Sequence, residues 1–310
     1  MKVAVIDIGT NNFNLLVAQQ DEFFYKTLLK SKSFVFLGKG GIQEKRILPE
    51  AIERALEALQ TFKKQIEAHG EMPILAIATS AVRNAQNGDE FVRLVKEQIG
   101  IEIQVIDGER EASLIFYGIK RHIRLPDNVL VMDIGGGSVE FIIGNSEQLY
   151  WKESFEIGAQ RLFYLFHKTE PISPQALNEM NEFLSQKLTN LFTALQKYPT
   201  DILVGSAGSF DTIVDIFCTE QGLPNTLRTN RYFQLPVHFF YQVHQQLIHK
   251  HLEQRKAMTG MLEQRAEMMT VAASLIDFVL KNCAMQQIIV SAAALKEGVV
   301  ANYFDQNNLL

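Results

Sequence analysis

The sequence predicts an α/β protein of two domains built on one plan, and three observations support this. Strand patterns alternate with helical patterns along the chain, which is typical of α/β proteins with partly parallel sheets. The chain has 310 residues, more than one average hydrophobic core accommodates. VAVIDIGTNNFNLLV (3–17) also aligns without gaps on VLVMDIGGGSVEFII (129–143). Two copies so far apart indicate duplicated domains rather than a solenoid repeat.

Local patterns predict the elements of each domain in order. In the first domain, the N-terminal hairpin is followed by a strand (22–36) and by a helix (48–70) with Pro49 in its first turn and Gly70 at its end. Strands and helices then alternate: a strand that runs into a polar turn (74–85), a helix (88–100), a strand (101–107) and a helix (108–123). In the second domain, the hairpin is followed by a strand (149–156), a helix from about 158 and one long amphipathic helix (173–198). A strand–turn–helix unit (201–217), a helical segment (236–282) and a final strand and helix (287–304) complete it. RLPDN (124–128) breaks the pattern and predicts a hinge near 120–127. We therefore expect one domain over 1–122 plus about 298–310, and the other over 123–297.

Composition narrows the class of protein. Apolar residues make up 47% and charged residues 21%, as in ordinary soluble globular proteins. The net charge of −5 argues against nucleic acid as a main partner, because such proteins need basic surfaces. Cys218 and Cys283 form no CxxC pair and are expected to be buried thiols in a reducing cytoplasm. The N-terminus does not read as a signal peptide, and no run of 18 apolar residues predicts a membrane span, so we expect a cytoplasmic protein.

Small-residue turns after buried strands predict a phosphate-binding cleft. In each repeated hairpin an Asp-x-Gly turn follows the strand, where glycine lets backbone N–H groups approach an anion. The Asp at the strand end suits a divalent cation held through water. One such turn is a weak signal, because hairpins often use Asp and Gly for turn geometry alone. Two matched copies, with GSAGS (205–209) and SAAAL (291–295), indicate a cleft between two domains.

Other polar residues are ambiguous from the sequence alone. Glu111 reads as an acid at a helix start and Arg83 as a surface arginine. Glu140 alternates with apolar neighbours in a buried hairpin, which leaves structural and functional roles equally open. The histidines of the 236–282 segment do not have the spacing of a closed metal-ligand set and are expected on a solvated helix face: His238, His244, His249 and His251.

The whole arrangement resembles the superfold of actin, sugar kinases and heat-shock chaperones. DIGTNNFNLL, ATSAVRNA, IDGEREASLIFYG, DIGGGSVEF, GSAGS and VSAAALKEGVV further resemble, in order and spacing, the exopolyphosphatase/guanosine pentaphosphate phosphohydrolase (Ppx/GppA) family. The resemblance covers nearly the whole chain. It implies two duplicated actin-like (ribonuclease H-like) domains with a phosphate-binding cleft between them.

The resemblance also implies an activity and a set of site residues. The family hydrolyses phosphoanhydride bonds, with inorganic polyphosphate or guanosine pentaphosphate as substrate. Glu111 and Glu140 match its catalytic carboxylates, and Arg83 matches an arginine facing the cleft. Mg²⁺ is the implied cofactor, with Asp7, Asp133 and Glu140 as its ligands. The implied phosphate-binding residues are Gly9, Thr10, Asn11, Gly135, Gly136, Gly137, Ser138, Gly205, Ser206, Gly208 and Ser209.

Departures from the family pattern keep other functions open. The family usually has Ser or Thr at Asn12, often a basic residue at Asn14, and Arg at Lys296. The sequence keeps Arg265 but lacks a Pro-Gly element common in longer relatives. Larger members add a C-terminal helical region that binds long polymer, which we do not expect in this chain, and this favours a short polyphosphate or a nucleotide over long polymers. Two alternatives therefore stand beside the hydrolase. One is an ATP-dependent kinase or ATPase with an adenine pocket near 205–210 and 260–300, and the other is a non-enzymatic sensor of polyphosphate or an alarmone. A homodimer is left open.

Overall fold

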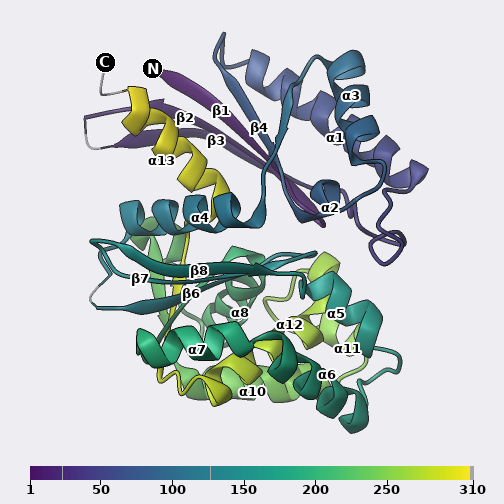
Figure 1. Ribbon diagram of the computed structural model, residues 1–310, viewed down its shortest axis with the longest axis vertical. Helices are drawn as coiled ribbons and strands as arrows, with labels where there is room; N and C mark the ends of the chain where they lie inside the picture. Colours follow the sequence, from purple (N-terminus) through teal and green to yellow (C-terminus); the bar gives the residue numbers. More distant parts are fainter. Residues whose placement is uncertain (23, 126, 308–310) are drawn as a thin grey trace.

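The computed structural model describes residues 1–22, 24–125 and 127–307, which form two α/β domains stacked one above the other (Figure 1). The first domain contains a five-stranded sheet. β1 pairs antiparallel with β2, β2 pairs antiparallel with β3, and β4 and β5 continue the other edge in parallel. The strand order across this sheet is β3 (Tyr25–Phe34), β2 (Asn12–Gln20), β1 (Lys2–Ile8), β4 (Ile74–Ala78), β5 (Ile103–Val105).

The second sheet repeats this plan. Its order is β8 (Leu149–Phe155), β7 (Val139–Gly144), β6 (Val129–Ile134), β9 (Ile202–Ser206), β11 (Gln287–Ser291), β10 (Tyr232–Leu235). The first five strands match β3-β2-β1-β4-β5 in order and direction, and β10 adds an antiparallel edge strand. The register repeats as well, since Asp7 lies opposite Asn14 and Asp133 opposite Glu140. The predicted fold of two duplicated actin-like domains is confirmed.

Helices separate the two sheets and cover their outer faces (Figure 1). The outer face of the first sheet packs on α1 (Pro49–Glu67) and α3 (Gly88–Ile99). Between the sheets lie α4 (Gly108–His122) and α13 (Leu295–Asn307), which share one core with apolar side chains from both sheets. The far face of the second sheet is covered by α5 (Ala159–Phe166), α6 (Pro174–Lys187), α7 (Thr189–Lys197), α8 (Ala207–Glu220), α10 (Val237–His249) and α12 (Glu263–Asn282). Short helices complete the fold: α2 (Ser80–Arg83), α9 (Leu227–Asn230) and α11 (Leu252–Lys256).

The last helix, α13, lies against α4 and the strands of the first domain, beside the N-terminus (Figure 1). Two glycines permit this close crossing, because a Cβ on Gly298 would lie 1.8 Å from the Leu114 carbonyl oxygen and one on Gly118 would lie 2.7 Å from the Gly298 nitrogen. The crossing brings Lys296, at the start of α13, to the cleft between the domains, with buried Glu297 paired to it. The domain boundaries drawn from the sequence remain a prediction.

Some helix predictions need correction. The long helix expected over 173–198 divides at Leu188, whose φ of −97° and ψ of 19° separate α6 from α7. His244 is 5% exposed, so its expected place on a solvated face is wrong. It lies on the face of α10 that packs against α12, where its Nε2 is 3.1 Å from Ser274 Oγ. In the described ranges, no helix is long and apolar enough to cross a membrane.

Candidate active site

Two matched turns, 9–12 and 135–138, line a cleft between the domains from opposite sides. The Gly9 N–H donates to the Asn12 carbonyl (3.1 Å), and the Gly135 N–H donates to the Ser138 carbonyl (3.0 Å). The turns touch, since a Cβ on Gly136 would lie 2.8 Å from Asn11 Nδ2. Glycine is therefore required on the second turn for contact with the first, in addition to any approach by a ligand. The turns enclose a cavity of about 180 Å³.

The structure brings most of the expected phosphate-binding residues to this cavity. Those that line it are Gly9, Thr10, Asn11, Gly135, Gly136, Gly137, Ser138, Gly208 and Ser209. Gly205 and Ser206 are not part of the lining, among the residues the structure describes. Gly205 instead makes room for the Phe210 ring, which would lie 2.2 Å from a Cβ, and Ser206 donates a hydrogen bond to Asp133 (2.5 Å). Buried Oδ1 atoms of Asn11 and Asn12 have no hydrogen-bond partner within the described part of the chain, as expected of side chains that await a ligand.

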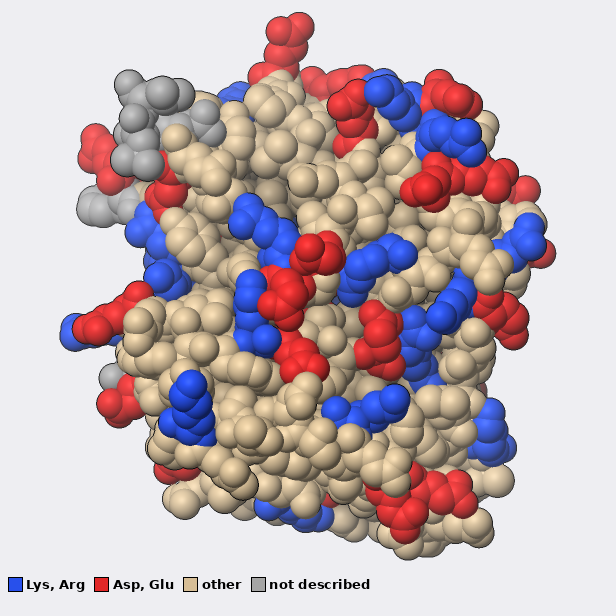
Figure 2. All heavy atoms as spheres, in the orientation of Figure 1, with Lys and Arg blue, Asp and Glu red and all other residues tan. Residues whose placement is uncertain are grey.

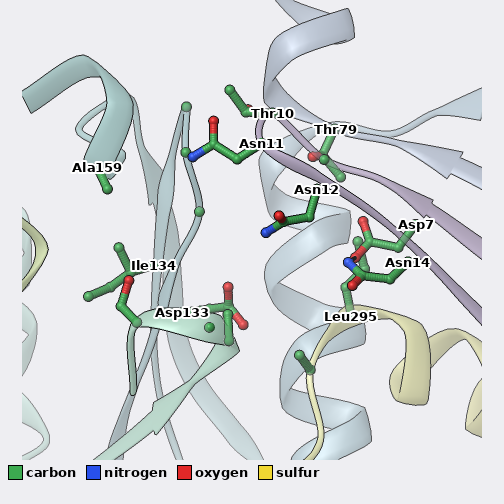
Figure 3. A pocket seen from close by; sticks show the side chains of 18 of the residues that line it. Asp7, Thr10, Asn11, Asn12, Asn14, Thr79, Asp133, Ile134, Ala159 and Leu295 are labelled. Atoms are coloured by element: carbon green, nitrogen blue, oxygen red, sulfur yellow. Dashed lines mark hydrogen bonds between the residues drawn. The ribbon is translucent and has the colours of Figure 1, made fainter. Parts of the chain in front are cut away.

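Asp7 and Asp133 face the cavity from its two walls, with Asn14 beside Asp7 and Asn12 between the walls (Figure 3). Asp7 accepts a hydrogen bond from Asn14 Nδ2 at 3.0 Å. Burial raises the pKa of Asp133 to about 6, although the Ser206 hydrogen bond opposes the shift. Burial likewise raises the pKa of Asp7, while the Lys296 charge opposes it. Both carboxylates would be stabilised by a bound cation.

Glu111 lines the same cavity from the first turn of α4. The Asp107 carboxylate caps this helix by accepting from the Arg110 N–H at 2.7 Å. Arg83 Nη1 donates to Glu111 at 2.9 Å and to the Ile106 carbonyl at 3.0 Å. A second carboxylate, Glu156, lies 3.6 Å from the Arg83 guanidinium. The resemblance predicts that Arg83 faces the cleft, but Arg83 is not part of the cavity lining. Its side chain is 17% exposed and fixes the position of Glu111.

Glu140 lies behind the cavity wall rather than in it. It is 1% exposed, is not part of the lining, and accepts a hydrogen bond from Ser154 Oγ at 2.7 Å. Burial and the neighbouring Asp133 charge raise the pKa of Glu140 to about 7. Burial and repulsion by Glu140 also raise the pKa of Glu111 well above its usual range, with Arg83 opposing the shift. Both carboxyl groups therefore bind a proton more readily than exposed glutamate side chains do.

Three basic side chains also line the cleft, and the sequence assigned none of them a firm role. Lys296 is paired with Glu297 at 3.2 Å. The Arg265 guanidinium lies beneath Gly208, where a Cβ would approach it to 1.7 Å. Lys32 is exposed in the cleft on β3, directly opposite Asn14. Strand alternation on β3 was the only signal for Lys32, and the pairing that brings it to the cleft is not visible in the sequence.

Charges of both signs gather where the domains meet on the face drawn in Figure 2. That face carries no continuous basic surface.

Comparison with known proteins identifies the family. The family model for the Ppx/GppA phosphatase family matches residues 16–307. The chain belongs to the Ppx/GppA family. The crystal structure of an exopolyphosphatase from Cytophaga hutchinsonii is 38% identical, covers 99% of this chain and 98% of its own, and superposes with a TM-score of 0.96. A Ppx/GppA family member from Aquifex aeolicus is 25% identical, with a TM-score of 0.82 and coverage of 99% of both chains.

A curated relative shows that Ppx/GppA sequences also occur within larger proteins. A bifunctional 3-dehydroquinate synthase/phosphatase from Fusobacterium nucleatum is 34% identical over 225 residues. The match covers 69% of this chain and spans about a third of the relative, 34% of its length.

The carboxylates of this Ppx/GppA chain have the donor atoms that a divalent cation such as Mg²⁺ prefers, but they do not form a complete set of protein ligands. Asp7, Asp133 and Glu140 offer only oxygen donors, which Mg²⁺ prefers. Within the described ranges, no three Asp, Glu, His or Cys side chains lie close enough together to hold a metal on their own. Mg²⁺ usually keeps several waters and binds through one or two carboxylates plus substrate phosphates. The donors fit that mode, and the ligand set given by the resemblance stays a prediction.

Proposed function

We propose that this chain is a Mg²⁺-dependent phosphoanhydride hydrolase that releases the terminal phosphate of inorganic polyphosphate or guanosine pentaphosphate. The observation that carries the proposal is Glu111, which faces a cavity formed by two matched glycine turns and is held by Arg83 at 2.9 Å. Phosphoryl transfer to water depends mainly on positioning and electrostatics, so a cleft that supplies a held carboxylate and phosphate-facing turns provides what the reaction needs.

Glu111 is the group we assign to the attacking water. It faces the cavity, whereas Glu140 does not, and the Arg83 contact at 2.9 Å favours its charged form. A carboxylate in this position aims the water at phosphorus and accepts its proton as the bond forms. Burial raises the pKa of Glu111, which makes its carboxylate a better proton acceptor.

Arg83 acts in this scheme mainly as a positioning residue. Its guanidinium contacts Glu111 and Glu156, and Arg161 holds Glu156 from the other side at 2.8 Å. A fixed fork of donors prevents the Glu111 carboxylate from rotating away from the substrate. The resemblance assigns Arg83 a direct role in stabilising the transferred phosphoryl group, which would require it to leave one of these carboxylates.

The remaining residues bind the phosphate chain. The turns at 9–12 and 135–138 present backbone N–H groups and the side chains of Thr10, Asn11 and Ser138 to the cavity. When bound, Mg²⁺ would be held by Asp7 and Asp133, which line the cavity, and would offset the charge of the phosphates. Glu140, the third ligand given by the resemblance, lies behind the cavity wall. Closure of the domains around the substrate excludes water from the phosphates other than the attacking one.

A comparative assay tests the proposal. Purified protein is incubated with Mg²⁺ and either inorganic polyphosphate or guanosine pentaphosphate, and released orthophosphate is measured over time. We expect release from at least one of the two. Tight binding of either compound with no release after long incubation would instead support a sensor. ATP turnover without release from either compound would support the kinase or ATPase alternative.

A further inference from the structure

Two phenylalanines form part of the cleft wall beside the first phosphate turn. Phe34 ends β3 and Phe36 follows two residues later, and both line the cavity. The residues that alternate with them, Val35 and Leu37, are buried in the core of the first domain. Alternation therefore directs Val35 and Leu37 into the protein and the two phenyl rings towards the cleft.

The rings do not serve the core. In the described part of the chain, neither is among the apolar side chains that pack on the three hydrophobic cores. They stack on each other instead, with centroids 6.0 Å apart and planes 27° apart. A cation lies over each ring, with Lys32 Nζ 4.7 Å from the Phe34 centroid and Lys39 Nζ 5.9 Å from the Phe36 centroid. A half-buried aromatic pair flanked by cations is unexpected in a cleft that binds only inorganic phosphate.

The backbone holds this pair in a strained conformation. Phe36 has a φ of +51°, which is a true outlier for a bulky residue. The strain is maintained from both sides, because the Phe36 N–H donates to the Asn11 carbonyl at 2.8 Å and Arg54 Nε donates to the Val35 carbonyl at 2.8 Å. Glycine would relieve the strain, yet the position carries a large ring. Strain held in place beside a ligand cleft points to a function for the side chain.

We propose that Phe34 and Phe36 form a stacking platform for the base of a nucleoside polyphosphate whose phosphates lie on the 9–12 turn. Phe34 lies opposite Asn12 in the β2–β3 register, so the platform is one strand spacing from that turn, about 5 Å. Lys32, two residues before Phe34 on the same face, and Lys39 lie where they would contact the phosphates or ribose of such a ligand. This inference rests on the proposed phosphate-binding function of the cleft. It assigns the cleft to nucleotides in preference to linear polyphosphate.

The expected gain follows from stacking. Stacking a base on an aromatic side chain is sequence-tolerant, and its loss weakens binding by roughly 5- to 100-fold. Inorganic polyphosphate has no aromatic surface and gains nothing from the rings. The platform therefore predicts a difference between two ligands that carry the same phosphates.

Calorimetry with GTP and inorganic tripolyphosphate tests this, since each carries three phosphates in a chain. The titrations use full-length protein with Mg²⁺, with Glu111→Gln present throughout to prevent turnover. We expect GTP to bind roughly 5- to 100-fold more tightly than tripolyphosphate. In the Phe34→Leu/Phe36→Leu variant the two ligands should bind equally, with tripolyphosphate affinity unchanged. Leucine keeps an apolar side chain without β-branching at both positions, and Phe36→Trp should retain the preference.

Three results would overturn the platform: equal affinities in the parent, a GTP preference that survives both leucines, or equal weakening of both ligands by them. A melting temperature within a few degrees of the parent shows that the leucine variant is folded. If the leucine variant does not fold, the affinities of Phe36→Trp for GTP and tripolyphosphate are compared instead. A failure of the proposed hydrolase function can be distinguished from a failure of the platform. It would appear as no phosphate release from any substrate, whatever the ratio of GTP to tripolyphosphate affinity.

Discussion

Replacing Glu297 by Gln should strongly destabilise the protein. Glu297 is 1% exposed and lies 3.2 Å from Lys296 and 3.1 Å from Lys30. The Lys296 charge is the largest effect that opposes burial, and the pKa of Glu297 falls from 4.5 to about 2. A shift of that size corresponds to about 3 kcal/mol of folding free energy at pH 7. It agrees with the cost of breaking a buried pair and leaving Lys296 without its partner.

The pH dependence of the loss in unfolding free energy tests more sharply whether the Glu297 charge is responsible. A depressed carboxyl pKa stabilises the folded state above the unfolded pKa, and this stability is lost as the pH falls through the folded pKa. The difference between wild type and Glu297→Gln should therefore shrink from about 3 kcal/mol at pH 7 to about 1 kcal/mol at pH 3. Urea unfolding of both proteins at the two pH values measures it.

Glu102→Gln is the matched control. Glu102 has a shorter ion pair, 2.7 Å from Lys96, but both partners are exposed. Its loss should change the unfolding midpoint little, because exposed ion pairs are screened by solvent. A Glu297→Gln effect no larger than the control, or one that does not depend on pH, would refute the reasoning.

Three further predictions concern the cleft. Glu111→Gln and Glu140→Gln should each slow steady-state phosphate release by at least about a hundredfold, and near-normal rates would remove either residue from the chemistry. Because the pKa of Glu140 is raised to about 7, metal-free protein should lose stability as the pH rises from about 4.5 to 7, and Glu140→Gln should flatten that decline in thermal melts at pH 5 and 7.5. An equally steep decline in both proteins would contradict the assignment. Chelation with EDTA should abolish phosphate release, with full recovery on adding Mg²⁺, and release that continues in EDTA would contradict the Mg²⁺ requirement.

The sequence predicted the parts of the fold that depend on local pattern. The two hairpins were visible because Asp7 and Asp133 end apolar strands and are followed by equivalent turns, and the register confirms the alignment residue for residue. The α4 start was visible from its polar turn and helical spacing. Both features need only neighbours in the chain, which is why sequence reasoning reached them.

The missed features depend on contacts between distant segments. Arg83 and Glu111 are 28 residues apart, and only the folded chain shows them as an ion pair. The sequence showed that Glu140 alternates with apolar neighbours, but only the folded chain shows that it lies opposite Asp133 and is covered. His244 was assigned to solvent because its spacing alone cannot reveal the packing of α10 on α12. Phe36 read as an ordinary strand end, since a positive φ leaves no sequence signal when the residue is not glycine.

Phosphorus NMR of polyphosphate and of guanosine pentaphosphate incubated with the Mg²⁺-loaded protein tests whether the cleft hydrolyses a terminal phosphoanhydride bond, because it shows which bond is broken. We expect growth of the orthophosphate signal at the expense of terminal phosphates with at least one substrate, and no growth with Glu111→Gln. Intact spectra for both substrates, or equal orthophosphate production by wild type and Glu111→Gln, would contradict it.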